Sequence, residues 1–223
     1  MERRSYYEAY DERYKTAHTA GFPWFGDTPT EIVSEVLRRY EISPDAPILE
    51  LGCGEGRDAV PLLEQGFNLL ATDVSSEAVS YCKKRFSAFE ARFRVLDCVR
   101  GELGGAYRFI FAVAVLHMLV PDADRNAFYH FIRRHLTADG IALICTMGDG
   151  IIERQSDIST AFDLQEREHN GSAVHVAATS CRMVRFDAFA AELASNGLYI
   201  LETGLTSVPG EFSDLMYAVA KRA

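Results

Sequence analysis

A short apolar run at residues 47–51 leads directly into three glycines that are separated by single residues. These glycines are Gly52, Gly54 and Gly56. A glycine-rich turn after a buried strand lets the backbone close around part of a nucleotide. Two carboxylates flank the turn, Glu50 before it and Asp58 after it. Their charge opposes a pyrophosphate and favours a ligand with an ammonium or a sulfonium. The loop therefore predicts a site for a cationic nucleotide without phosphate.

The spacing of the glycines argues against a dinucleotide site. Such a site needs G-x-G-x-x-G, but here the pattern is G-x-G-x-G, with Arg57 where the last glycine is expected. Asp73 closes the next apolar run, where an acid can accept hydrogen bonds from both ribose hydroxyls. The alternative for Asp73 is a helix-capping role. Asp97, next to Cys98 at the end of the third run, fits an adenine amine or a turn equally well.

Alternating apolar runs and amphipathic segments must position these residues. Strands are predicted near residues 48–52, 67–73, 91–97, 107–115 and 141–147, with helices between them. The first scaffold helix is predicted over 28–40, with Thr28 as N-cap, Pro29 at the first position and Glu31 closing a capping box. This alternation predicts an α/β fold with a doubly wound, mostly parallel sheet. The last two strands are joined by only TSVPGEFS, so the final strand should be antiparallel.

Two regions do not belong to this scaffold. Residues 1–27 are rich in aromatic side chains, among them Tyr14, Trp24 and Phe25. They are predicted to form a lid over the cofactor, the alternative being a segment that only packs against the sheet edge. Residues 148–180 are polar and weakly patterned, and a loop of this length inside a domain is more often functional than idle. We therefore expect a domain at 28–223 with a lid or substrate insertion at about 148–180.

Composition narrows the class of partner. The 223 residues include 32 acidic and 23 basic side chains, for a formal net charge of −9, which opposes binding to nucleic acid. No apolar run is long enough to span a membrane, and no signal peptide is apparent, so a cytoplasmic protein is expected. Five scattered cysteines and the absence of an H-E-x-x-H spacing give no reason to expect a disulfide framework or a metal. A small-molecule substrate fits this composition best.

The ordered segments ILELGCGEGRDA, LLATDVS, VLDC, FIFAVAVLHML and LTADGIALICT resemble the motifs of class I S-adenosylmethionine-dependent methyltransferases. The resemblance covers roughly residues 28–147, and it implies a Rossmann-like fold of seven strands with the last antiparallel. GEGRDAVPLLEQGFNLLATDVS, with PWFGD before it, is more weakly similar to the tellurite-resistance and thiopurine methyltransferase group. The fourth strand departs from the pattern, because Arg108 stands where an aspartate is usual.

The resemblance implies S-adenosylmethionine as cofactor, with Gly52 and Gly54 near its methionine part, Asp73 at the ribose, Asp97 with Cys98 at the adenine and the backbone near Val113 at the amino acid moiety. The full set of predicted cofactor-binding residues is Trp24, Glu50, Gly52, Cys53, Gly54, Arg57, Asp73, Val74, Asp97, Cys98 and Val113. Tyr14 and Phe25 are the predicted substrate lid. His117 follows the fourth strand and is predicted to act as a general base or to orient the substrate, the alternative being a histidine hydrogen-bonded inside the fold. The predicted activity is methyl transfer to a small molecule such as a thiol or a chalcogen oxyanion. The alternatives are a non-catalytic cofactor-binding module and an NAD-dependent oxidoreductase. The sequence indicates no oligomeric state.

Overall fold

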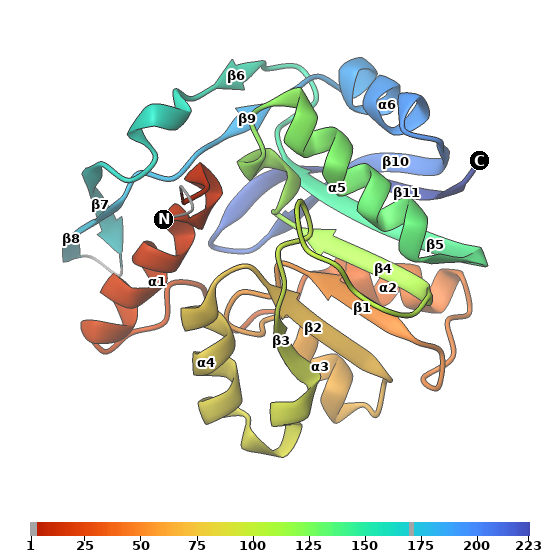
Figure 1. Cartoon of the computed structure of the whole chain (residues 1–223), viewed down its shortest axis with the longest axis horizontal. Helices are drawn as coiled ribbons and strands as arrows, with labels where there is room; N and C mark the ends of the chain where they lie inside the picture. The colour runs from red at the N-terminus through yellow and green to blue at the C-terminus, as the bar shows by residue number, and fades with distance from the viewer. Residues whose placement is uncertain (1–3, 170–171) are drawn as a thin grey trace.

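A seven-stranded sheet is the centre of the molecule (Figure 1), in a computed structural model that describes residues 4–169 and 172–223. The strand order is β10-β11-β5-β4-β1-β2-β3. The strands are β1 (Ile48–Leu51), β2 (Leu69–Asp73), β3 (Phe93–Val95), β4 (Tyr107–Val113), β5 (Leu136–Met147), β10 (Leu198–Val208) and β11 (Phe212–Arg222). Strands β1 to β5 run parallel, and β11 is antiparallel to both of its neighbours. The predicted doubly wound sheet with an antiparallel last strand is confirmed.

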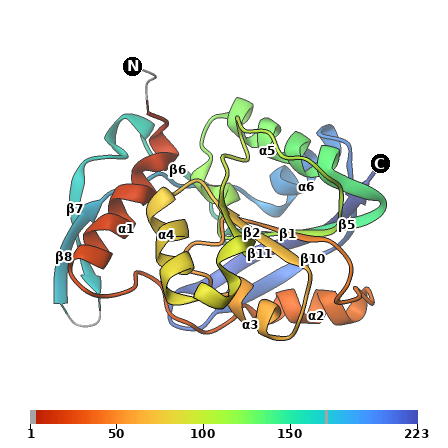
Figure 2. The same ribbon diagram turned by 60° about the horizontal axis from the view of Figure 1, so that its bottom comes forward.

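Helices cover both faces of the sheet (Figure 2). These are α2 (Glu31–Arg39), α3 (Ala59–Glu64) and α4 (Ser76–Arg85) on one face, and α5 (Asp122–His135) and α6 (Phe186–Ser195) on the other. The alternation of side chains along β4 explains the two layers: Phe109 and Phe111 pack into the first core, while Ile110 and Ala112 pack into the second. All four side chains are fully buried, as expected for a parallel strand covered on both faces.

The N-terminal segment and the insertion lie side by side at the carboxyl end of the parallel strands (Figures 1 and 2). Helix α1 (Ala9–Thr19) follows the short turn η1 (Tyr6–Glu8) and packs against the hairpin of β7 (Leu164–His169) and β8 (Ser172–Ala177). The insertion also contains η4 (Ile158–Thr160) and pairs β6 (Arg154–Gln155) with β9 (Arg182–Met183). Residues 1–3 of the predicted lid and residues 170–171 of the predicted insertion lie outside the described residues.

The predicted start of the first scaffold helix was wrong by two residues. Helix α2 begins at Glu31, and its N-cap is Thr30 in extended conformation rather than Thr28. The backbone N–H and the hydroxyl of Thr30 donate to the two carboxylate oxygens of Asp58, at 2.6 and 3.0 Å. This long-range contact holds Thr30 outside the helix. Pro29 therefore precedes the N-cap and is not the first residue of the helix. Ser75 is the N-cap of α4, and its side chain accepts from the N–H of Ala78 at 3.0 Å.

Strand β5 also begins earlier than predicted, at Leu136 instead of after Gly140. Leu136 pairs with Tyr107, and the register then shifts before Ile141 pairs with Phe109. A Cβ at Gly140 would lie 2.9 Å from the Tyr107 carbonyl oxygen. Gly140 is therefore a position inside the strand where two backbones approach closely, and not a stop before the strand.

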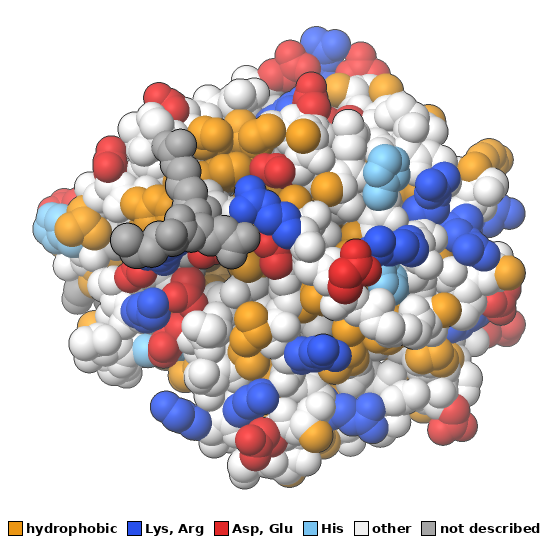
Figure 3. All heavy atoms as spheres, in the orientation of Figure 1, with side chains coloured by type: hydrophobic (Ala, Val, Ile, Leu, Met, Phe, Trp, Pro, Cys, Tyr) orange, Lys and Arg blue, Asp and Glu red, His pale blue; other side chains and the backbone are white. Residues whose placement is uncertain are grey.

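Basic side chains gather over the C-terminal end of α5 (Figure 3). Arg133 and Arg134 lie in its last turn. Arg134 forms an ion pair with Glu102 at 3.2 Å, and both side chains are exposed.

Within the described residues no helix is long and apolar enough to cross a membrane.

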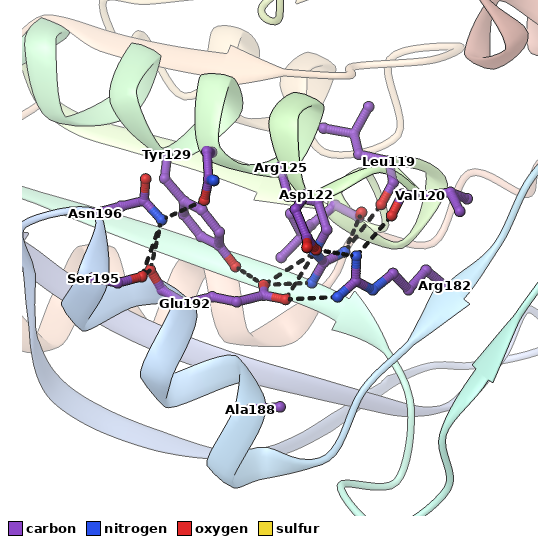
Figure 4. A network of polar contacts seen from close by, with 12 residues as sticks. Leu119, Val120, Asp122, Arg125, Tyr129, Arg182, Ala188, Glu192, Ser195 and Asn196 are labelled. Carbon is purple, nitrogen blue, oxygen red and sulfur yellow. Dashed lines mark hydrogen bonds and ion pairs between the residues drawn. The ribbon is translucent and has the colours of Figure 1, made fainter.

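A buried ionic network joins α5 to α6 and to the insertion (Figure 4). The Arg125 guanidinium is 1% exposed and donates to both carboxylate oxygens of Glu192, at 2.6 to 3.1 Å. Its remaining amino group donates to the carbonyl oxygens of Leu116 and Leu119. Tyr129 also donates to Glu192, at 2.8 Å. This network fixes the loop that follows β4.

Replacing Arg125 with methionine should lower the free energy of unfolding by about 3 kcal/mol, because it leaves Glu192 without its principal partner in a poorly solvated position. Arg134→Met is the matched control on the same helix, and it should cost at most about 1 kcal/mol, because its ion pair is exposed. Urea unfolding of both variants measures the difference. Equal losses would show that the buried network does not stabilise the fold.

Candidate functional site

A cleft opens at the carboxyl ends of β1, β2 and β4, beneath the N-terminal segment. Counted with its open mouth, the cleft has an empty volume of about 940 Å³. Twelve of the fourteen site residues predicted from the sequence line it: Tyr14, Phe25, Glu50, Gly52, Cys53, Gly54, Arg57, Asp73, Val74, Asp97, Cys98 and Val113. Trp24 and His117 do not line it. The fold thus brings together residues that are up to 99 positions apart in the chain.

The glycine loop is held in a left-handed conformation by the neighbouring strand. The N–H groups of Gly52 and Cys53 both donate to the Thr72 carbonyl oxygen, at 2.7 and 2.9 Å. Gly52 and Gly54 have φ values of +75° and +52°, which side chains with a Cβ rarely adopt. A Cβ on Gly52 would lie 2.2 Å from a methyl carbon of Val115. The loop needs glycine for its backbone angles and for this close approach.

The Asp73 carboxylate connects the end of β2 to this loop. One of its oxygens accepts from the Gly54 N–H and the other from the Ser75 N–H, both at 2.8 Å. Burial raises the pKa of Asp73 to about 6, although these N–H donors oppose the shift. Each carboxylate oxygen keeps a second lone pair, so the group can still accept from a pair of ligand hydroxyls.

Glu50 is buried in the floor of the cleft, and its Oε2 atom has no hydrogen-bond partner. Burial, with the nearby charge of Asp58 adding to it, raises the pKa of Glu50 well above its usual range. Asp58 itself is occupied by Thr30 and by Arg57, whose guanidinium lies 3.3 Å from the carboxylate. Of the two acids that flank the loop, Asp58 is therefore structural, whereas Glu50 has a free acceptor for a cation.

Asp97 has a partner that the sequence did not reveal. Its Oδ2 atom accepts from the hydroxyl of Tyr7 at 2.8 Å, and its Oδ1 atom accepts from the N–H of Val99. Tyr7 is 3% exposed and lines the cleft. Burial raises the pKa of the adjacent Cys98 thiol to about 12, so this thiol is uncharged at neutral pH. The segment that follows β3 thus carries a carboxylate that is hydrogen-bonded by an N-terminal tyrosine.

Glu55, inside the glycine loop, fastens the aromatic segment over the cleft. Its Oε1 atom accepts from the N–H of Trp24 at 2.9 Å, and its Oε2 atom accepts from the N–H of Phe25 at 2.8 Å. A ring nitrogen of His18 lies 2.7 Å from the same carboxylate. The Trp24 ring lies outside the cleft lining, with the Arg13 guanidinium 4.9 Å from its centroid.

His117 lies in the short turn η3 (Leu116–Met118) and is not part of the cleft lining. It is 2% exposed, and its Nδ1 atom has no partner. Burial lowers the pKa of His117 to about 4, and the Arg125 guanidinium adds to the shift. The imidazole is therefore neutral at physiological pH. Its predicted role in catalysis stays a prediction.

Other predicted residues contribute walls and neutral groups. The neighbouring Cys82 thiol and burial raise the pKa of Cys53 well above its usual range, and both thiols donate to the Gly54 carbonyl oxygen. Arg57 makes an ion pair with Glu211 as well as with Asp58. Among the described residues no group of three or more histidine, cysteine or acidic side chains is arranged to hold a metal ion.

The glycine loop lies within a segment that matches a known protein family. Residues 48–140 match the family model described as "Methyltransferase domain". The CcbJ methyltransferase of Streptomyces caelestis superposes with a TM-score of 0.72 at 15% identity, covering 99% of this chain and 100% of that one. The glycopeptide N-methyltransferase MtfA, solved with S-adenosylmethionine, gives a TM-score of 0.66 at 20% identity over 90% of this chain and 96% of its own.

The fold is that of a class I S-adenosylmethionine-dependent methyltransferase. The malonyl-[acyl-carrier protein] O-methyltransferase of Bacillus anthracis is 29% identical over 143 residues, which are 62% of this chain and 50% of that protein. The chain spans about half the length of the curated relatives it matches. The segment that matches the family model, residues 48–140, contains the glycine loop, Asp73 and Asp97.

Gly52→Ala should destabilise the fold more than Gly210→Ala. Both positions have positive φ, but a Cβ at Gly210 meets nothing within 4 Å. Gly210→Ala should therefore cost only the backbone strain, about 1 to 2 kcal/mol. Gly52→Ala should cost about 2 kcal/mol more, because its Cβ overlaps Val115. Adding Val115→Ala to Gly52→Ala should recover that difference in urea unfolding. No recovery would mean that the loop is not packed against Val115 as described.

Proposed function

We propose that this protein binds S-adenosylmethionine in the cleft and transfers its methyl group to a small molecule. The observation that supports this most directly is the unpartnered Oε2 atom of Glu50, buried beside a glycine loop. A buried carboxylate without a partner is costly unless a cation pairs with it. The α-ammonium of the cofactor supplies that cation. NAD is the less favoured ligand, because this acid and the missing third glycine oppose a pyrophosphate.

Each part of the cofactor has a matching group in the cleft. Asp73 retains acceptor capacity for both ribose hydroxyls. Asp97, covered by Tyr7, can accept from the adenine amine, and the backbone at Gly52 and Gly54 leaves room for the methionine part. Bound in this way, the cofactor supplies a methyl group on a positively charged sulfur. The protein's task is to orient the acceptor in line with that bond and to exclude water.

The identity of the acceptor is a separate question. The thiol and the chalcogen oxyanion predicted from the sequence stay predictions, as does the weaker similarity to the tellurite-resistance and thiopurine methyltransferase group. The Bacillus anthracis relative is named for a malonyl-carrier protein substrate. The solved 1,6-didemethyltoxoflavin-N1-methyltransferase from Burkholderia thailandensis holds 1,6-didemethyltoxoflavin and S-adenosylhomocysteine. The proteins that this chain resembles act on very different substrates. Their similarity therefore supports the proposed cofactor more strongly than it supports any one acceptor.

Calorimetric titration with S-adenosylmethionine, S-adenosylhomocysteine and NAD tests the proposed cofactor. Glu50→Gln should weaken S-adenosylmethionine binding 10- to 100-fold, the loss expected for a hydrogen bond to a charged group. Burial raises the pKa of Glu50 above its value in the unfolded chain, so this acid destabilises the fold increasingly as the pH rises above the unfolded-chain value. Glu50→Gln should therefore also unfold at a higher temperature at pH 8. Glu64→Gln, an exposed acid on α3, should change neither quantity. Tighter binding of NAD than of S-adenosylmethionine would refute the proposal, and cofactor binding without methyl transfer to any acceptor would favour the non-catalytic module.

The N-terminal segment is proposed to be a lid that opens for cofactor exchange. Glu55→Gln removes the charge that holds the N–H groups of Trp24 and Phe25, so proteolytic cleavage within residues 20–30 should accelerate several-fold. S-adenosylhomocysteine should close the segment over the cleft and so slow cleavage of the unmodified chain. Trp24 is the sole tryptophan, so its fluorescence emission should change when the ligand is added. With Glu64→Gln as control, equal cleavage with and without ligand would mean that the segment is permanently packed.

A further inference from the structure

Five rings form a continuous row along the cleft. The ring centroids of Tyr10 and Tyr14 are 6.1 Å apart, and those of Tyr14 and Phe25 are 6.4 Å apart. Phe212 lies 6.2 Å from Phe25 and 6.1 Å from the imidazole of His117. The rings come from α1, from the segment before α2, from the start of β11 and from η3. All but His117 line the cleft, and none of them belongs to the groups matched above to the ammonium, the ribose or the adenine.

The charge of the cleft lining is strongly one-sided. Five carboxylates line it: Glu50, Glu55, Asp58, Asp73 and Asp97. Arg57 is the one cationic side chain among the described residues that line it, and its guanidinium is engaged by Asp58 and by Glu211. No cationic group in this lining is left to receive an anion. An anionic acceptor would therefore enter against the field of these carboxylates.

We propose that the acceptor is an uncharged heteroaromatic molecule, methylated on a pyridine-type ring nitrogen between the aromatic rings. This inference rests on the proposed methyl transfer from S-adenosylmethionine. The nitrogen lone pair forms the new N–C bond while the C–S bond breaks, and the electron pair of that bond stays on sulfur. The positive charge moves from sulfur to the methylated ring, and no proton is transferred.

The two observations favour this reaction over methylation of an acidic group. Because the charge is kept in the site, the carboxylates and the ring faces stabilise the product as they stabilise the sulfonium. Methylation of a carboxylate or an oxyanion would bring a negative charge into the same site and neutralise the sulfonium there. A thiol or a phenol must first lose a proton, and the neutral His117, whose pKa burial lowers to about 4, is a weak acceptor for it.

Binding to the protein loaded with S-adenosylhomocysteine tests the charge preference. The probes are N-methylisoquinolinium, which imitates the product, and 2-naphthoate, an anion of the same size. We expect the cation to bind at least tenfold more tightly by calorimetry, with the difference shrinking at high salt. Equal or tighter binding of 2-naphthoate, or no measurable binding of the cation, would overturn the inference.

Turnover separates the inference from the proposed function. With S-adenosylmethionine present, isoquinoline should give N-methylisoquinolinium and S-adenosylhomocysteine by mass spectrometry, in preference to 2-naphthoate, 2-naphthol and 2-naphthalenethiol. Methylation of one of these three in preference to isoquinoline would overturn the inference and leave the methyltransferase function intact. Failure of S-adenosylmethionine to bind would overturn both.

A substitution in the ring row provides the matched control. Phe212→Leu keeps an apolar side chain but removes one ring face, so affinity for N-methylisoquinolinium should fall several-fold while S-adenosylhomocysteine affinity stays within twofold. Tyr199→Leu makes the same kind of change on β10, at a side chain that is 59% exposed and outside the cleft, and should change neither affinity. Unchanged cation binding by the Phe212 variant would remove the ring row from the acceptor site.

Discussion

The contact on which the site depends is the pair of hydrogen bonds that the Asp73 carboxylate accepts at the end of β2. One comes from Gly54 in the loop after β1 and the other from Ser75 at the start of α4, both at 2.8 Å. A single buried group thus fixes the loop, the strand end and the helix start relative to one another. Its burial raises its pKa, which is the electrostatic cost of keeping an acceptor in this position.

Carboxylates also anchor the N-terminal segment to the scaffold. Tyr7 donates to Asp97 at 2.8 Å, and Glu55 accepts from the N–H groups of Trp24 and Phe25. Asp11 of α1 accepts from the Ser75 hydroxyl at 2.7 Å. Each anchor lies at the carboxyl end of a parallel strand or in the turn that follows it. Asp97 and Glu55, which hold the N-terminal segment, also line the cleft beside Glu50 and Asp73. The acids that fix this segment therefore contribute to the negative charge of the cleft.

Local patterns in the sequence predicted the strands, most of the helices and the carboxylates at the strand ends, because these follow from periodicity and from glycine spacing. They did not predict Tyr7 or Glu55, whose partners lie 90 and 30 to 31 positions away in the chain. The aromatic density of residues 1–27 indicated a lid but not which tyrosine reaches Asp97. The misplaced N-cap has the same origin, since Thr30 owes its conformation to Asp58, 28 positions away.

The loop after β4 connects α5, α6 and the insertion to the cleft, because side chains from these parts of the fold hold the loop in place. Arg125 holds two of its carbonyl oxygens, Ser180 donates to the Met118 carbonyl at 2.7 Å, and Arg182 donates to the Val120 carbonyl at 2.7 Å. Glu192 compensates the charge of both arginines, at 2.6 Å from Arg125 and 3.7 Å from Arg182. This irregular loop lies outside the strands of the sheet, and the side chains of Arg125, Ser180 and Arg182 donate to its carbonyl groups in place of a neighbouring strand. Met118 lines the cleft, so packing by residues outside the glycine loop determines the shape of this part of the cleft. Proteins that share a fold can differ in substrate through such outer residues.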